Sequence, residues 1–344
     1  MTAGSPEMAE LSPEPWQEPV RGRSCDPAAL ALPGREQVLA LQDGRLPRPP
    51  NARLTGRRIV EVGNAGVTCA MPLSPWLQGP KGRIHPGVLV LLGDSALTAA
   101  VLTALPPGVV FTTAELSMTF LAEMPPPGGE LRAVASALHL EARHGLAVAD
   151  LLGPGGARLG FGTSRVFLQP PMDMSEAPPF SPAPDDEDWP TPDPCERELS
   201  EAPPPLAGHG VVELADTRTG ERPRPPIDRL LGIRLAAVGD GEVTFTLPAS
   251  EWLANELGMV SGGMLGLLAH SATSAAGQTV ARPGSPYRSL DVKVNFLEQV
   301  PPDGSPIVAT GRALHRGKLV VANTEVTHGG QLVAMATGST VLGS

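Results

Sequence analysis

The chain has 344 residues, enough for two domains of ordinary size, and only 3% of them are aromatic, so its core has to be built from Leu, Val and Ala. The formal net charge is −10, but residues 169–208 carry ten acidic side chains against Arg197 alone, so the remainder is close to neutral and no nucleic-acid binding is expected. Cys25, Cys69 and Cys195 share no close spacing, and neither a secretory signal nor a membrane-spanning run is recognisable, which predicts a cytoplasmic protein with no disulfide framework, metal or cofactor.

The N-terminal segment, residues 1–46, is expected to be partly disordered, because its first ~25 residues are rich in Pro and Glu. From Pro47 onward the chain repeats itself at a displacement of 176 residues. "PRPPNARLTG" (47–56) falls on "PRPPIDRLLG" (223–232), and no gap is needed as far as His139; one extra residue in the first copy then aligns Ser164 with Ser339. We therefore predict an internal duplication, with repeats at 47–168 and 223–344.

The segment between the copies, residues 169–222, is acidic and holds twelve prolines between Pro170 and Pro205. Such a composition cannot bury a core of its own, and it predicts an extended, solvated linker.

Each copy has the same expected elements in the same order. Two short strands ("RRIVEVG" and "GVTCAMP" in the first copy) lead through a loop with Trp to one apolar helix, at about Gly87 to Thr103 and Gly263 to Thr279. Three or four strands complete the copy; "SLDVKVNF" (289–296) alternates cleanly, and a hairpin is expected to turn at 328–330. A helix that is apolar nearly all round has to be buried, so each copy is predicted to be an α+β unit whose antiparallel sheet wraps one helix.

The two helix starts differ in the residues that could carry chemistry. Gly262 and Gly263 offer free backbone N–H groups at a positive helix end, which suits an oxygen that gains negative charge in a transition state. In the first copy Pro86 occupies the position of Gly262 and has no N–H. The alternative is that the glycines only permit tight packing.

The middles of the two helices differ as well. Asp94 is an acid in an apolar helix, where burial raises a carboxyl pKa and suits a general base, whereas the second copy has His270 there. Ordinary structural roles, a backbone-bonded Asp and a satisfied interface His, remain open for both. Gly262 and His270 lie ~12 Å apart along one helix. If the helices pack antiparallel about a pseudo-twofold axis, Gly262 and Gly263 face Asp94, while Pro86 faces His270.

The repeat and its motifs resemble the hotdog-fold acyl-CoA thioesterases, specifically the phenylacetate-pathway thioesterase family in a double-hotdog arrangement. The resemblance covers about 47–168 and 223–342 and is carried by "NELGMVSGGMLGLLAHSA", "SLDVKVNFLEQVPPDG", "GRALHRGKLVVANTEV" and "GQLVAMATG". It implies a tandem hotdog fold and thioester hydrolysis at the interface of the repeats, with an acyl-CoA substrate. It also implies the catalytic residues Asp94, Asn255, Gly262, Gly263 and Thr113, and a further hydroxyl at Thr98.

This chain departs from that family pattern at two positions. Ser261 stands where the family has His, and His270 stands where it has the second acid, which implies one site per chain. The literal "HGG" at 328–330 lies in the expected hairpin turn and is not the motif. Whether Asp94 activates water or attacks the thioester directly stays open. Arg316 and Lys318 are candidates for binding coenzyme A phosphates, or are ordinary exposed bases.

Two other functions stay open at this stage. A non-catalytic acyl-CoA binding protein would not need Asp94, and a hotdog-type hydratase or dehydratase would need a catalytic His from elsewhere in the chain. Association of such pseudo-dimers into a homo-oligomer is also a possibility that the family suggests.

Overall fold

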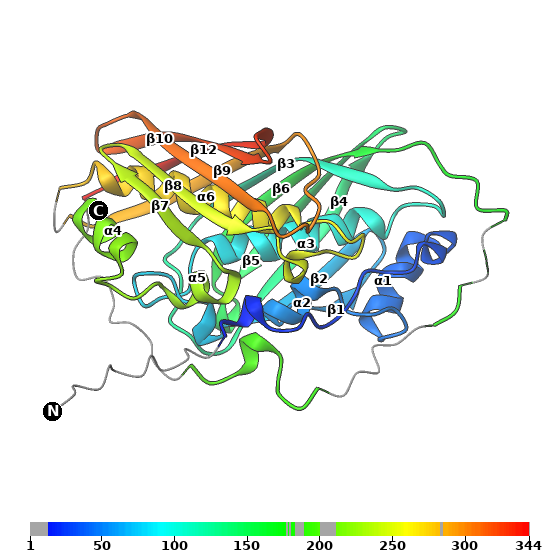
Figure 1. The fold of residues 1–344 in the computed structure, drawn as a ribbon. Helices are drawn as coiled ribbons and strands as arrows, with labels where there is room; N and C mark the ends of the chain where they lie inside the picture. Colours follow the sequence, from blue (N-terminus) through cyan, green and yellow to red (C-terminus); the bar gives the residue numbers. More distant parts are fainter. Residues whose placement is uncertain are drawn as a thin grey trace, which may run out of the picture.

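The computed structural model describes residues 13–176, 178, 180–182, 189–199, 211–282 and 285–343. Its two halves join in one antiparallel sheet of twelve strands that curves around a pair of helices (Figure 1). The predicted α+β architecture, two antiparallel sheets each wrapped around one apolar helix, is thereby confirmed.

The two halves have matching elements. The first half contains α1 (Gly34–Gln42), α2 (Pro50–Thr55), β1 (Arg58–Val62), β2 (Gly66–Pro72), α3 (Gly87–Leu102), β3 (Phe111–Phe120), β4 (Glu130–Leu140), β5 (His144–Leu152) and β6 (Arg158–Leu168). The second half contains α4 (Val211–Thr219), α5 (Pro226–Leu231), β7 (Arg234–Gly239), β8 (Glu242–Pro248), α6 (Gly262–Thr279), β9 (Tyr287–Phe296), β10 (Pro306–His315), β11 (Leu319–His328) and β12 (Gln331–Leu342).

The halves are related by a pseudo-twofold axis. The strand order is β1-β2-β4-β5-β6-β3-β9-β12-β11-β10-β8-β7, so β3 and β9 join the halves at the centre. Ser117 pairs with Lys293 there, and these residues are equivalent under the 176-residue displacement, so the axis passes through this pair.

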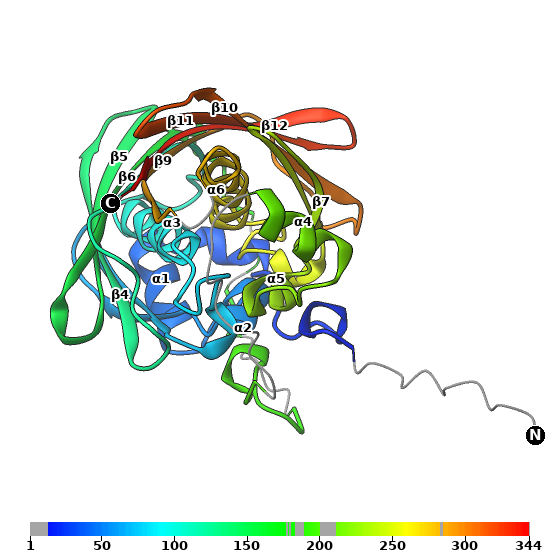
Figure 2. The ribbon, with the colours of Figure 1, turned by 90° about the vertical axis from the view of Figure 1, so that its left-hand side faces the viewer.

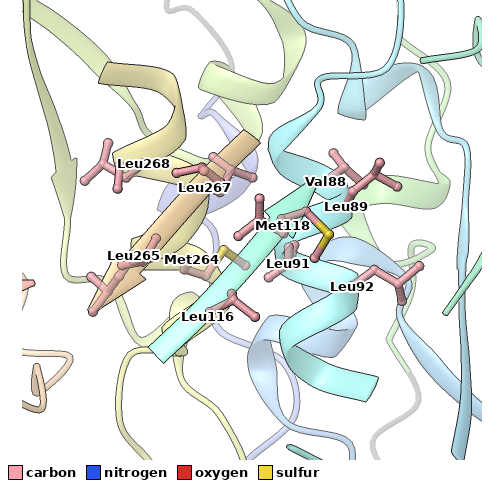
Figure 3. Close-up of a cluster of buried hydrophobic side chains, with 14 of the residues drawn as sticks. Val88, Leu89, Leu91, Leu92, Leu116, Met118, Met264, Leu265, Leu267 and Leu268 are labelled. Atoms are coloured by element: carbon pink, nitrogen blue, oxygen red, sulfur yellow. The ribbon is translucent and has the colours of Figure 1, made fainter. Parts of the chain in front are cut away.

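Helices α3 and α6 lie side by side under the concave face of the sheet, as the view along them shows (Figure 2). Both are apolar on nearly every side, and their leucines pack with Leu116 and Met118 of β3 in one continuous core (Figure 3). The helices are antiparallel and very close at the start of α6. A Cβ on Gly263 would lie 3.0 Å from the Leu91 Cα, so glycine permits this approach.

The duplicated unit begins earlier than the sequence comparison indicated. Helix α1 corresponds to α4 under the same displacement, with Gly34 on Gly210 and Gly44 on Gly220. Each helix packs against the first strand of its own half, α1 on β1 and α4 on β7. The expectation of disorder in the first ~25 residues therefore does not hold for residues 13–25, which include the buried Arg21; residues 1–12 lie outside the described residues.

The acidic segment between the copies is not solvated throughout. Asp193 and Cys195 are buried, and the Asp193 carboxylate lies 3.7 Å from Arg21 and 3.4 Å from both Arg48 and Arg53. Composition alone concealed this, because the acid is compensated by bases from the N-terminal segment and α2 rather than by neighbours in sequence. Residues 183–188 and 200–210 of the expected linker lie outside the described residues.

Two smaller expectations, about the strands and the last hairpin turn, are confirmed. Each half has four strands after its long helix, and the 328–330 turn joins β11 to β12 with Gly329 and Gly330 at positive φ. Within the described ranges, no helix is long and apolar enough to cross a bilayer, and no group of three potential metal ligands is found.

Candidate active site

The start of α6 faces the middle of α3, as the spacing predicted. The backbone N–H of Gly263 donates a 2.7 Å hydrogen bond to Oδ2 of Asp94, across 169 residues of sequence. A Cβ on Gly262 would lie 3.5 Å from both carboxylate oxygens. Ser261 is extended (ψ 138°), so the helix begins abruptly at Gly262 and its first N–H groups have no partner within the helix.

Asp94 is held in a strongly perturbed environment. It is only 5% exposed, and burial raises the pKa of its carboxyl from 3.8 to about 6. The Gly263 N–H, the Arg57 guanidinium and the Ser261 hydroxyl each oppose that rise in pKa, and the Glu256 carboxylate adds to it. Oδ1 of Asp94 is buried and has no hydrogen-bond partner in the described structure, so one carboxylate oxygen is held and the other is free.

Asp94 lines a large cavity. A volume of about 630 Å³ opens between α3, the bulged start of β3, the loop before α6 and the N-terminal segment. Six of the predicted residues line it: Asp94, Thr98, Thr113, Asn255, Ser261 and Gly262. Most of the other walls are apolar, with contributions from Leu102, Val109, Phe111, Leu265 and Phe296. A cavity of this size and character fits a small organic ligand with an apolar group.

The amide and hydroxyl side chains are placed differently around the cavity. Oδ1 of Asn255 accepts from the N–H groups of Leu257 (2.9 Å) and Met259 (3.1 Å) and so shapes the loop before α6. Its NH₂ group has no acceptor in the described part of the chain and is free for a ligand. The Thr98 hydroxyl donates to the Asp94 backbone carbonyl at 2.8 Å, one turn back along α3, and is therefore partly committed to the helix.

The predicted coenzyme A bases lie elsewhere. Arg316 pairs with Asp240 at 2.8 Å beyond the end of β10, and neither Arg316 nor Lys318 is among the residues that line the cavity. The structure therefore does not bring these two residues together with Asp94.

The opposite helix start faces His270, and the described residues there are arranged differently. The Gly87 N–H, equivalent to that of Gly263, donates to Nδ1 of its own neighbour His85 at 3.1 Å. The His270 ring lies edge-on to His85 and Phe120, with centroids 5.4 and 5.0 Å away, and neither of its nitrogens has a partner in the described structure. Burial holds the pKa of His270 well below 6.5, and that of His85 at about 4, so both rings are neutral at physiological pH.

Polar groups fill the rest of that second region. Tyr287, Gln278 and Lys81 occupy the positions of Phe111, Leu102 and Leu257, which line the cavity in the other copy. The Tyr287 hydroxyl donates to Gln278 at 3.0 Å, and the Lys81 ammonium lies 3.7 Å over the Tyr287 ring and donates to its carbonyl. Side chains that would shape a pocket here are bonded to one another instead.

Sequence reasoning missed two contributors to the cavity. The N-terminal segment supplies a wall, including Leu30, Val38 and Leu46, and Arg57 supplies a buried cation. Comparison of the two repeats does distinguish Arg57. The equivalent residue in the second copy is Ile233, so this charge is found in one copy only.

Comparisons with known proteins agree with this geometry. The model of the thioesterase superfamily matches residues 81–149, which include all of α3 and Asp94. No curated protein matches the chain significantly. Among solved structures, a protein assigned as a thioesterase from Novosphingobium aromaticivorans superposes with a TM-score of 0.51 at 16% identity, covering 82% of this chain and 97% of that one.

Two further structures extend the comparison. The tesB protein of Mycobacterium avium subsp. paratuberculosis has a TM-score of 0.50 at 13% identity and covers 85% of this chain and 98% of its own. A protein with a hotdog fold from Alicyclobacillus acidocaldarius has a TM-score of 0.50 at 14% identity, with 83% and 96% coverage. The fold is shared over more than four fifths of the chain, so the chain has a double-hotdog fold, and its residues 81–149 are similar to the thioesterase superfamily.

Proposed function

We propose that the protein is an acyl-CoA thioesterase with one competent active site, at the interface of its two repeats. The observation that carries the proposal is the juxtaposition of Asp94 with the start of α6 on an apolar cavity. One carboxylate oxygen is anchored by the Gly263 N–H and the other is unpartnered, while the N–H of Gly262 donates to no acceptor in the described residues. An acid, a free backbone donor and room for an acyl group are what thioester hydrolysis requires.

The reaction would proceed as follows. The thioester carbonyl oxygen accepts from the Gly262 N–H, where the partial positive charge of the α6 N-terminus favours the developing oxyanion. Oδ1 of Asp94 removes a proton from a water molecule while the oxygen of that water forms a bond to the thioester carbonyl carbon. The tetrahedral intermediate then expels the thiolate, which takes the proton from Asp94, leaving a carboxylic acid and free coenzyme A. The NH₂ group of Asn255 is free to orient the water or the carbonyl, and Thr113 lines the same cavity.

Direct attack by Asp94 is the competing route. It would break the same thioester bond but form an anhydride between Asp94 and the acyl group, which water then opens. A single turnover in H₂¹⁸O distinguishes the two routes, because hydrolysis of the anhydride at the Asp94 carbonyl would leave ¹⁸O in the protein.

The function is tested by following free thiol release from a panel of straight-chain and aryl acyl-CoAs. We expect hydrolysis of at least one class, loss of at least 100-fold in Asp94→Asn, and little change in His270→Gln. Binding without thiol release, unaffected by Asp94→Asn, would instead indicate an acyl-CoA binding protein. Loss of hydrolysis in His270→Gln but not in Asp94→Asn would place the chemistry at the opposite helix start.

A further inference from the structure

Arg57 is the one cation among the described residues that line the cavity. It follows Gly56, whose left-handed conformation (φ 72°) ends α2, and its side chain is only 6% exposed. The other ionisable groups on the cavity wall, apart from Cys25, are acidic: Asp26, Asp94, Glu256 and Glu298.

Two polar side chains from different parts of the chain clamp this guanidinium. Nη2 of Arg57 donates to Oδ1 of Asn51 at 3.0 Å and to the Glu256 carboxylate at 3.2 Å. Asn51 is buried on α2, while Glu256 follows Asn255 in the loop before α6, 199 residues after Arg57. The loop is fixed in turn by backbone hydrogen bonds from Cys25 to Glu256 (2.8 Å) and from Asn51 to Ala254 (3.1 Å). The cation is therefore held rigidly at the cavity wall.

The second copy provides an internal comparison. The positions of Asn51, Arg57 and Glu256 are occupied there by Ile227, Ile233 and Pro80, so all three polar groups are replaced together. Ile227 and Ile233 are buried in the apolar core. The clamp is thus found on the side that has Asp94 and is missing from the side that has His270, which associates it with the acid rather than with the fold of the unit.

We propose that Arg57, clamped by Asn51 and Glu256, is a positioning residue for the hydrolysis, whose fixed cation keeps the Asp94 carboxylate in its ionised form. The effect of Arg57 on hydrolysis rests on the proposed function, whereas its effect on the ionisation of Asp94 does not. Within the described residues Arg57 is ion-paired with Glu256 at 3.2 Å and not with Asp94, so its effect on the acid is electrostatic and acts without direct contact. This arrangement favours the charged acid without occupying Oδ1, which has no hydrogen-bond partner in the described structure.

The charges around Asp94 agree with this role. Its carboxyl is surrounded by the Gly263 N–H and Ser261 hydroxyl from the start of α6, by Arg57 from the end of α2 and by Glu256 from the loop before α6. Arg57 lowers the pKa of Asp94 more than Glu256 raises it, so the clamped pair has a net effect in favour of ionisation. Asp26 and Glu298 also line the cavity and carry the opposite charge to Arg57.

The test uses two substitutions that should act in opposite directions. Arg57→Gln removes the cation, and Glu256→Gln removes the anion while leaving Arg57 and Asn51 in place. The Asp94 carboxyl is titrated by ¹³C NMR, with its signal assigned by its loss in Asp94→Asn. We expect the pKa of Asp94 to rise by on the order of one unit in Arg57→Gln and to fall in Glu256→Gln. The acid limb of kcat/KM should move in the same two directions, and Arg57→Lys should restore part of the shift.

The control is Arg312→Gln, which removes an exposed cation on β10 and should move neither quantity. The proposal would be overturned if the pKa of Asp94 moved in the same direction in Arg57→Gln and Glu256→Gln, or if it moved in neither of these variants when folded. Arg57 would then be a structural residue. If Arg57→Gln fails to fold, Glu256→Gln alone tests the proposal: a fall in the pKa of Asp94 supports it, and a rise or no change overturns it. Absence of thiol release in the unmodified protein would refute the proposed function only, because the NMR titration needs no turnover.

Discussion

Replacing Asp94 by Asn is expected to abolish hydrolysis and, at neutral pH, to stabilise the folded chain. Burial raises the pKa of Asp94 from 3.8 to about 6, so the folded state holds its proton more tightly than the unfolded state. The resulting cost of ionisation is absent below pH 3.8, grows between pH 3.8 and about 6, and is constant above that. It amounts to about 1.5 kcal/mol at pH 5 and about 3 kcal/mol at pH 8.

The amide would relieve this cost with little change in shape. Its oxygen can still accept from the Gly263 N–H, while its NH₂ group takes the place of Oδ1, which has no partner in the described structure. An unpaired buried NH₂ group offsets about 1 kcal/mol of the gain at every pH. The net stabilisation is then about 2 kcal/mol at pH 8 and about 0.5 kcal/mol at pH 5.

Urea unfolding of both proteins at pH 5 and pH 8 measures this difference. Asp228, whose pKa burial raises to about 7, is present in both proteins and cancels in the comparison. Asp150→Asn, which removes an exposed carboxylate on β5, is the matched control and should show no such pH dependence. Equal or lower stability of Asp94→Asn at pH 8, or a difference that does not change between the two pH values, would refute the reasoning and identify Asp94 as a satisfied structural carboxylate.

Three further predictions follow from the site and its support. Because Asp94 must be ionised, kcat/KM should fall about tenfold per pH unit below pH 6, as measured in a series of buffers. Neither His85 nor His270 can cause this fall, because burial lowers the pKa of both rings further. Gly262→Pro removes an N–H at a helix position that tolerates proline and should lower kcat by roughly 100-fold, whereas Gly262→Ala keeps the N–H and should lose less; equal activities would exclude that donor. Asp193→Ala removes the buried carboxylate that lies within 3.7 Å of Arg21, Arg48 and Arg53 and should cost about 3 kcal/mol in urea unfolding, while a loss under about 1 kcal/mol would indicate a solvated cluster.

The pairing of Asp94 with the start of α6 could be predicted because the duplication is regular. No gap interrupts the match between Pro47 and His139, so the two long helices begin within one residue of equivalent positions and have nearly the same length. Antiparallel packing about a twofold axis then brings each helix start to the middle of its partner. Residue spacing could not predict which backbone N–H of α6 would donate to Asp94. That choice depends on the distance between the helices, which is set by side-chain packing and by the absence of a Cβ at Gly263.

The remaining parts of the site depend on contacts between distant segments. Arg57 acquires its role from Glu256, and the cavity acquires a wall from residues that precede the first repeat. The acidic segment at Asp193 was misjudged for the same reason, since its partners lie more than 130 residues earlier. Composition reports how many charges a segment carries, whereas burial depends on which charges from elsewhere meet them.

The asymmetry of the two helix starts has a physical rationale in the cost of the site itself. A single buried carboxylate costs about 3 kcal/mol at neutral pH, a large fraction of the net stability of a domain. Two identical chains forming such an interface would bear that cost twice, whereas a fused pair can differ at equivalent positions. Here His270, which stays neutral when buried, stands at the position equivalent to Asp94, and Ile227 and Ile233, which pack in the core, stand at the positions equivalent to Asn51 and Arg57. The same chain therefore retains one electrostatically demanding site and converts the other into packing.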